Sequence, residues 1–316
     1  MHADAVRGYY LRSVLQFRSE NAAGAAETSW RSVQAGRSGD ALTAARSQAE
    51  AGRCLLLLER EIAKAKDMLE GAHAVLQGEQ DDLMLNWGLG LLKRYLGEPE
   101  EAARLLRLSA VLAQRVQSHW EETECLRALT FLAIEQGDFA SARALCPLLL
   151  ELATKMGEGS ERPIAEALDS LARVLDGEAE AAPGLDVALG RVRQADAKSM
   201  LSAVLNFAAD HDFACGRFEQ AHERATEALT AAKTVERNNQ VAIARALLAR
   251  LAVRAADLNC ARAQLDPLRA ELAIPFTLSL HARKAVEIAM REFEESSQPK
   301  LESHPKTRRP ISSRGI

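Results

Sequence analysis

Aromatic side chains are scarce in this chain of 316 residues, where tryptophan, tyrosine and phenylalanine together make up 4% of the sequence. Runs of β-branched residues are nearly absent, whereas alanine, leucine, arginine and glutamate, which are good helix formers, are abundant. Both features argue against a β-sandwich, a β-barrel and a parallel-sheet enzyme. The composition therefore predicts an all-α protein.

The chain also lacks paired cysteines and long apolar runs. Its five cysteines are odd in number, far apart and without any Cys-x-x-Cys spacing, which is typical of reduced thiols in a helical core. No apolar run approaches the roughly 18–20 residues that a membrane helix needs, and residues 1–20 carry charge without the apolar core of a signal peptide. We therefore expect no membrane segment and a cytoplasmic localisation.

The charges nearly balance, with 40 basic and 44 acidic side chains and a net charge of −4. This balance gives no general electrostatic reason to bind nucleic acid or an anionic membrane. Residues 296–316 differ, because three of the nine prolines occur there among lysines and arginines. We predict a basic disordered tail, which is either simply solvated or a nucleic-acid contact.

Recognisable catalytic motifs are missing too. There is no phosphate-binding Gly-x-x-x-x-Gly-Lys-Ser/Thr loop, no His-Glu-x-x-His and no EF-hand loop. Asp210, His211 and Asp212, with His222 nearby, are the most tempting metal ligands, but consecutive residues on a helix point in different directions. We therefore predict no catalytic residue, no metal and no cofactor, and we expect that the chain is not an enzyme.

What the chain does contain is a repeat of about forty residues. A Gly-x-x-x-x-Ala segment recurs with its glycine at positions 97, 137, 177 and 216, and a weaker copy begins at Ala256. The glycine suits the residue after a helix, which commonly has a positive φ, and the alanine lets a second helix approach the first. Such a period predicts stacked antiparallel helix pairs, an α-solenoid in which each pair buries its apolar face on the next.

The apolar spacing places the helices of each pair. We predict first helices at 41–58, 82–96, 119–136, 161–176, 197–215 and 239–255, and second helices at 61–77, 99–116, 139–156, 185–194, 218–234 and 258–272. Residues 1–39 would form an incomplete or capping pair, and 40–295 the repeat domain. Pro147 and Pro267 should kink or restart their helices. Ser118 with Glu121 predicts a capping box.

At the turns Gly137-Asp-Phe and Gly216-Arg-Phe, the sequence resembles the tetratricopeptide repeat (TPR) family, over roughly residues 40–275. Its period is longer than that family's usual one and is similar to the repeats of bacterial ATP-dependent transcription activators of the maltose-regulator type. The resemblance implies a right-handed superhelix with a concave groove that binds a peptide, a protein or an effector. Carried onto this chain, the family's groove positions are Trp87, Arg94, Tyr95, Glu124, Arg127, Phe131, Glu135, Asn206, Asp210, Arg250 and Arg254.

We therefore predict a non-catalytic interaction scaffold or sensor in a bacterial regulatory or signalling pathway, including transcription regulation, with a protein or peptide partner. Aromatic and arginine side chains often dominate protein recognition, although Trp87 and Tyr95 would serve equally as packing residues between repeats. Two alternatives remain open: a nucleic-acid-associated regulator that uses the basic tail, and a regulatory fragment of a larger ATPase or cyclase. The sequence leaves the oligomeric state undetermined.

Overall fold

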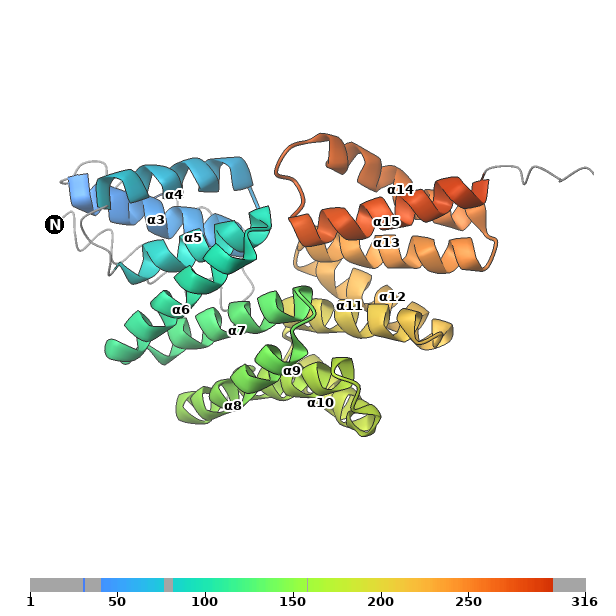
Figure 1. The fold of residues 1–316 in the computed structure, drawn as a ribbon, viewed down its shortest axis with the longest axis horizontal. Helices are drawn as coiled ribbons and strands as arrows, with labels where there is room; N and C mark the ends of the chain where they lie inside the picture. The colour runs from blue at the N-terminus through green and yellow to red at the C-terminus, as the bar shows by residue number, and fades with distance from the viewer. Residues whose placement is uncertain (1–30, 32–40, 77–81, 158, 298–316) are drawn as a thin grey trace, which may run out of the picture.

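The computed structural model describes residues 31, 41–76, 82–157 and 159–297, and within them it contains thirteen α-helices and no strand (Figure 1). The predicted all-α solenoid is confirmed. The predicted capping pair at 1–39, apart from residue 31, and the basic tail beyond residue 297 lie outside the described residues.

Twelve of the helices form six consecutive pairs. The first helices are α3 (Ala41–Leu57), α5 (Leu83–Leu96), α7 (His119–Glu135), α9 (Glu161–Leu175), α11 (Lys198–Ala214) and α13 (Asn238–Arg254). The second helices are α4 (Ile62–Leu76), α6 (Pro99–Arg115), α8 (Phe139–Met156), α10 (Ala182–Gln194), α12 (Phe218–Thr234) and α14 (Leu258–Ala273). Consecutive pairs stack on one another, as the repeat predicts.

The turn glycines behave as the repeat requires. Gly97, Gly137, Gly177 and Gly216 have φ values of 83°, 72°, 92° and 77°, and each donates its main-chain N–H to the carbonyl three residues back. Ala256 takes the same place with a φ of 59°. The alanines five positions later in four of these turns, Ala102, Ala142, Ala221 and Ala261, are fully buried where the two helices meet. The glycine ends the first helix, and the alanine sets the close approach of the second.

The predictions for the two helix prolines, the capping box and the degenerate unit had different outcomes. The chain runs as one helix through both Pro147 and Pro267, so neither proline restarts its helix. The Ser118 hydroxyl contacts the Glu121 carboxylate but caps no main-chain N–H, so the predicted capping box is incomplete. The unit after Gly177 is degenerate as expected, because a short 3₁₀ turn (Ala179–Ala181) precedes a second helix of 13 residues.

One helix was not predicted at all. α15 (Leu280–Ser297) follows the sixth pair and packs mainly on α13, burying Ala282, Val286, Ala289 and Phe293. It includes positions 296 and 297, which the sequence assigned to the tail. The array therefore ends on an unpaired helix that takes the place of a first helix in a seventh unit.

Small side chains dominate the core. A large apolar cluster runs from Trp87 on α5 to Ala244 on α13, and many of its buried members are alanine or leucine. Trp87 meets Trp120 edge to face, with ring centroids 5.7 Å apart. Alanine brings helix backbones close together, so a long array is built without many aromatic residues.

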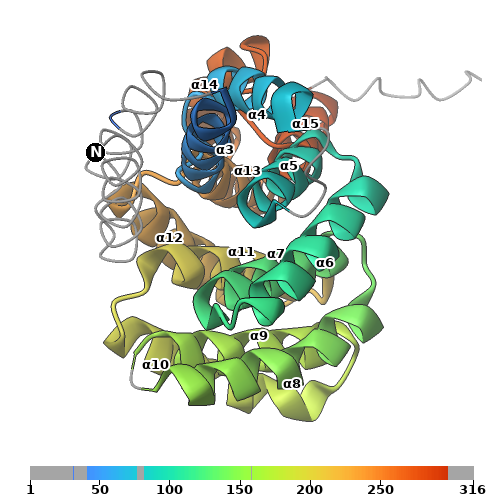
Figure 2. The same cartoon turned by 90° about the vertical axis from the view of Figure 1, so that its left-hand side faces the viewer.

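The array curves until its two ends meet. In Figure 1 the first pairs and the last helices stand opposite each other, with α8 to α10 at the far end of the arch, and Figure 2 shows α13, α14 and α15 behind α3 to α5. α5 contacts α15 directly. We call the closing contact the seam: it joins residues 59–60 and 95–97 on one side to residues 236–239 and 276–280 on the other.

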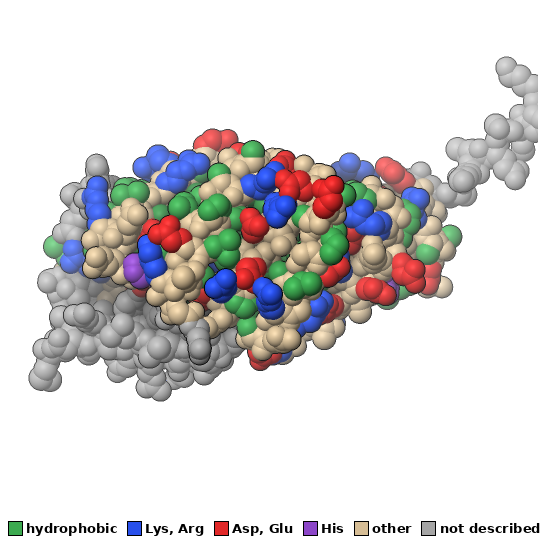
Figure 3. Space-filling model, turned by 90° about the horizontal axis from the view of Figure 1, so that it is seen from below, with side chains coloured by type: hydrophobic (Ala, Val, Ile, Leu, Met, Phe, Trp, Pro, Cys, Tyr) green, Lys and Arg blue, Asp and Glu red, His purple; other side chains and the backbone are tan. Residues whose placement is uncertain are grey.

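The outer surface carries both signs of charge. On the face shown in Figure 3, acidic and basic side chains are interspersed with small hydrophobic areas. Most ion pairs join residues close in sequence or on neighbouring helices, as in Arg104–Glu101 and Arg193–Glu227. None of the described helices is long and apolar enough to cross a membrane.

Candidate functional site

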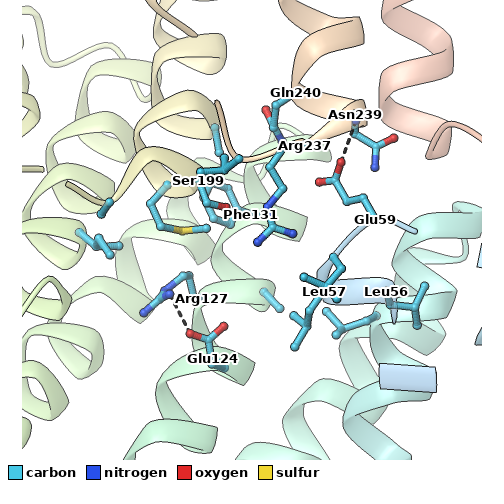
Figure 4. A pocket seen from close by; sticks show the side chains of 18 of the residues that line it. Leu56, Leu57, Glu59, Glu124, Arg127, Phe131, Ser199, Arg237, Asn239 and Gln240 are labelled. Atoms are coloured by element: carbon cyan, nitrogen blue, oxygen red, sulfur yellow. Dashed lines mark hydrogen bonds and ion pairs between the residues drawn. The ribbon is translucent and has the colours of Figure 1, made fainter. Parts of the chain in front are cut away.

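A cavity of about 550 Å³ lies on the inner side of the arch, close to the seam (Figure 4). Its walls come from the inner helices of several units, from the turn between α3 and α4, and from the corners between units. This arrangement follows from the repeat, because each first helix turns one face to its partner and another toward the axis of the curve. The cavity falls within the range of roughly 300–1,000 Å³ that ligand pockets occupy.

Arg127 forms one charged wall. Its guanidinium pairs with Glu124 at 2.8 Å on the same helix and with Glu161 at the start of α9. Burial lowers the pKa of Arg127, but the two carboxylates outweigh this and leave it raised, so the side chain stays charged. Its Nε is buried without a hydrogen-bond partner among the described residues.

Arg94 forms a second charged wall. Its Nε and Nη2 bond to the Glu135 carboxylate at 3.0 and 2.6 Å, a bidentate pair that joins α5 to α7. The same guanidinium lies 5.6 Å from the centre of the Phe131 ring. The pair therefore presents an ordered cation, an ordered anion and an aromatic ring to the cavity.

Aromatic rings line the space between these charges. Phe131 on α7 stacks on Phe207 on α11 at 6.0 Å, and Phe207 lies 5.4 Å from the His281 ring on α15. Burial lowers the pKa of His281, which favours a neutral imidazole. Met156, Met200 and Ile164 extend the apolar surface. Thioether and aromatic groups suit a ligand side chain of irregular shape.

The remaining wall comes from two corners that meet at the seam. Glu59, after α3, accepts a 2.7 Å hydrogen bond from the main-chain N–H of Asn239, and burial raises its pKa. Arg237 precedes α13, and Figure 4 shows its guanidinium extending into the space between Glu59 and Phe131. Asn239 and Gln240 add side-chain amides to this wall.

The structure brings together six of the eleven residues that the family resemblance placed in the groove: Arg94, Tyr95, Glu124, Arg127, Phe131 and Glu135 all line the cavity. Trp87 does not, because its side chain is 0% exposed and packs between Trp120 and Arg53. Trp87 is therefore a core residue and does not face the cavity, where the family resemblance placed it.

The other four predicted residues lie away from the cavity wall. Asn206 is buried and donates to the main-chain and side-chain oxygens of Gln240. Arg250 pairs with Asp210 at 3.2 Å and with Glu292, and Arg254 lies 4.0 Å above the Phe218 ring. These contacts link neighbouring units. The side chains of residues 210–212, which the sequence analysis considered as metal ligands, do not converge on one point. Asp212 instead pairs with Arg217 and Arg224.

Sequence reasoning missed Glu59, Arg237, Asn239, Gln240 and Ser199. Glu59 lies in the turn between the two helices of the first pair, and the other four lie where α11 or α13 begins a new unit. None of them is one of the groove positions that the family resemblance assigned. No group of three histidine, cysteine, aspartate or glutamate side chains that could hold a metal occurs in the described part of the chain. The site thus offers charge pairs, amides and an apolar wall for binding.

No protein-family model matches the sequence, and no curated protein matches it. Solved structures are similar in fold. The Rap protein complexed with competence and sporulation factor aligns with a TM-score of 0.68 and 14% identity, over 92% of this chain and 80% of that one. NprR in complex with its cognate peptide NprX aligns with a TM-score of 0.67 and 14% identity, over 93% and 85%.

A tetratricopeptide repeat protein from Parabacteroides merdae aligns with a TM-score of 0.54 and 13% identity, over 92% of this chain and 99% of that one. At these identities the likeness concerns the fold alone. The chain has the TPR-like helical-repeat fold.

Proposed function

We propose that this chain is a non-catalytic sensor that binds a short peptide, or a small effector of similar chemistry, in the cavity inside the arch. The observation that carries the proposal is the cavity itself, in which ordered Arg–Glu pairs stand beside an apolar wall and side-chain amides. A peptide needs all three kinds of contact, because it has a polar main chain and mixed side chains. A bacterial regulatory pathway and a cytoplasmic setting are part of the same proposal.

The charges favour a ligand with both polar and apolar groups. Arg94 and Arg127 are already paired, so a ligand would share their carboxylate partners rather than neutralise an isolated charge. Such sites gain specificity from placement, while the apolar wall supplies much of the affinity. Phe131, Phe207 and Met200 are the side chains on which an apolar ligand group would pack.

The solved structures of similar fold support the proposal by analogy of architecture. In two of them, Rap is complexed with competence and sporulation factor, and NprR is in complex with its cognate peptide NprX. By this analogy a chain of the same architecture, with a cavity among its inner helices, is a peptide-responsive regulator. The similarity of the repeat length to maltose-regulator-type activators stays a prediction.

A cavity-filling substitution tests the site without removing any charge pair. Ala203 lines the cavity on α11, and Ala203→Leu would occupy part of its volume. Ala140→Leu is the matched control, because Ala140 is an exposed helical alanine at the start of α8. Peptides would first be selected from a random displayed library on the purified wild-type protein, and their affinities then measured by calorimetry.

We expect Ala203→Leu to weaken binding of the selected peptides by about tenfold or more, since overpacking a filled site costs about 1–3 kcal/mol. Ala140→Leu should bind as the wild type does. Thermal unfolding of both variants checks that the fold is intact. Equal affinities for all three proteins would place the peptide elsewhere and remove the basis of the proposal.

A further inference from the structure

The seam differs from every junction between consecutive pairs in how it is held together. Glu59 bonds to the N–H of Asn239 at 2.7 Å, Arg60 pairs with Glu236, and Tyr95 Oη donates to the Thr277 carbonyl at 3.0 Å. Most of these contacts are polar and lie at the ends of helices. Hydrogen bonds that replace contacts with water contribute little net stability each.

The apolar cores on the two sides of the seam are separate. One cluster lies on α3 to α6, and another lies on α13 to α15. Within the array, by contrast, one continuous cluster crosses several unit boundaries between α5 and α13. Because apolar burial dominates the cost of separating packed elements, we expect the seam to separate at a lower cost than a junction that such a cluster crosses.

An apolar contact between Gly97 and Leu280 also crosses the seam, and it depends on the glycine. A Cβ atom at Gly97 would lie 2.1 Å from Cδ2 and 3.1 Å from Cβ of Leu280. At Gly137, the equivalent turn in the next unit, a Cβ atom would meet nothing within 4 Å. The glycine at 97 therefore serves both the turn and the fit of α15 against α5.

The seam and the cavity share residues. Glu59, Tyr95, Asn239 and Ser279 line the cavity, and the first three also make the closing contacts. Separating the two sides of the seam therefore moves part of the cavity wall outward. A ligand group in the cavity would likewise contact Glu59, Tyr95 and Asn239, the side chains that close the seam.

We propose that the array opens and closes at the seam. In the open form, the two sides of the seam separate and the cavity widens. The motion is a hinge opening distributed over the stacked units, which keep their apolar contacts. This opening does not depend on the identity of the ligand. It explains why the contacts that close the array are mainly polar and share residues with the cavity wall.

Spin labels on either side of the seam test the proposal without any ligand. Ala63 on α4 and Ala270 on α14 are exposed, so Ala63→Cys and Ala270→Cys accept labels attached through a thioether. The exposed Cys215 and Cys260 are replaced by serine, and the buried cysteines are retained. Pulsed dipolar spectroscopy then gives the distribution of distances between α4 and α14 in the full-length chain.

Gly97→Asn and Gly137→Asn are the matched pair of variants. Asparagine tolerates the positive φ of both turns, so backbone strain is similar, but only at position 97 does the new side chain press on Leu280. We expect Gly97→Asn to raise the long-distance population about tenfold, and Gly137→Asn to leave the parent distribution unchanged. Identical distributions for the two variants would overturn the proposal.

A reversible lock gives the opposite test in a single polypeptide. Gly97→Cys with Leu280→Cys places two Cβ atoms about as close as 3.1 Å, and a small relaxation reaches the roughly 3.5–4.5 Å of a disulfide. After oxidation and labelling, half of the sample is reduced. We expect the oxidised form to lose the long-distance population and the reduced form to regain it. A long-distance population that survives oxidation would show that the array opens elsewhere, whatever the outcome of the peptide-binding experiment.

Discussion

The phenol of Tyr95 donates a hydrogen bond to the main-chain oxygen of Thr277 at 3.0 Å, across 182 positions of sequence. The main-chain oxygen of Phe276 is a second acceptor for the same phenol, 3.2 Å from Oη of Tyr95. Burial raises the pKa of Tyr95, so the phenol keeps its proton and remains a donor. A side chain that the repeat pattern placed in a groove thus also joins the two ends of the array.

Replacing Tyr95 by phenylalanine should loosen the seam and little else. The substitution keeps the aromatic ring and removes a partly buried hydrogen bond, which costs about 1 kcal/mol and leaves the Phe276 and Thr277 carbonyls without this donor. We expect amide hydrogen exchange in residues 276–280 to become about fivefold faster. Thr154→Val, which removes a hydroxyl bond within α8, is the control and should leave that segment unchanged. Equal exchange in both variants would contradict the role of Tyr95.

The Arg94–Glu135 pair should contribute measurably to stability, unlike the surface pairs. Its side chains are 24% and 12% exposed, and the bond is bidentate between two helices. A double-mutant cycle with alanine, followed by urea denaturation, should give a coupling of about 1–3 kcal/mol. The exposed pair Arg104–Glu101, also bidentate, is the comparison and should give about 0.5 kcal/mol or less. Similar couplings for both pairs would contradict this assignment.

Glu59 should make the stability of the protein fall as the pH rises. Burial raises its pKa above the ordinary 4.5, although Arg237 and the Asn239 N–H act in the opposite direction. The folded state therefore holds this proton more tightly than the unfolded state does. The favourable contribution is complete below pH 4.5 and is lost as the pH rises through the raised pKa.

Glu59→Gln removes this titration, so the stability of the variant relative to the wild type should increase from pH 4 to pH 8. Urea denaturation across that range measures the difference. Glu101→Gln should give the opposite slope, because Arg104 lowers the pKa of Glu101 and its contribution is lost as the pH falls. Parallel wild-type and Glu59→Gln curves would contradict the prediction.

Ala256→Gly should stabilise the protein. Ala256 has a φ of 59° at the turn where the four preceding units have glycine, and a side chain in this region costs roughly 1 kcal/mol. We expect a gain of about 0.5–1 kcal/mol in the free energy of unfolding. Ala255→Gly, one residue earlier with a φ of −78°, should lower stability instead. A loss in both variants would show that the turn carries no strain.

Much of the array could be predicted because its rules are local. A glycine with a positive φ ends one helix, and an alanine five positions later fixes where the next one packs, so most helix ends fell within a few residues of the structure. The six cavity residues on α5 and α7 were found because a groove position counted back from a turn glycine remains on the same face of its helix. These features depend on residues close together in sequence.

The rest depends on contacts that no local pattern encodes. α15 has a helical spacing in Ala282, Val286, Ala289 and Phe293, but no turn glycine or paired helix marks it as a repeat. Trp87 and Arg94 are both predicted groove positions of α5, but Trp87 is buried because Trp120 and Arg53 pack against it. Glu59 and Asn239 become neighbours only through the accumulated curvature of six pairs.

Because α5 and α15 meet, the number of units between them is fixed by the curvature of the array. An open solenoid can gain or lose one repeat in evolution with little effect beyond its length, since each unit touches only its neighbours. Here an added or deleted unit of forty residues would move Leu280 away from Gly97, and the residues on both sides of the seam would lose their partners. Duplication or loss of a repeat is therefore incompatible with the contact between α5 and α15.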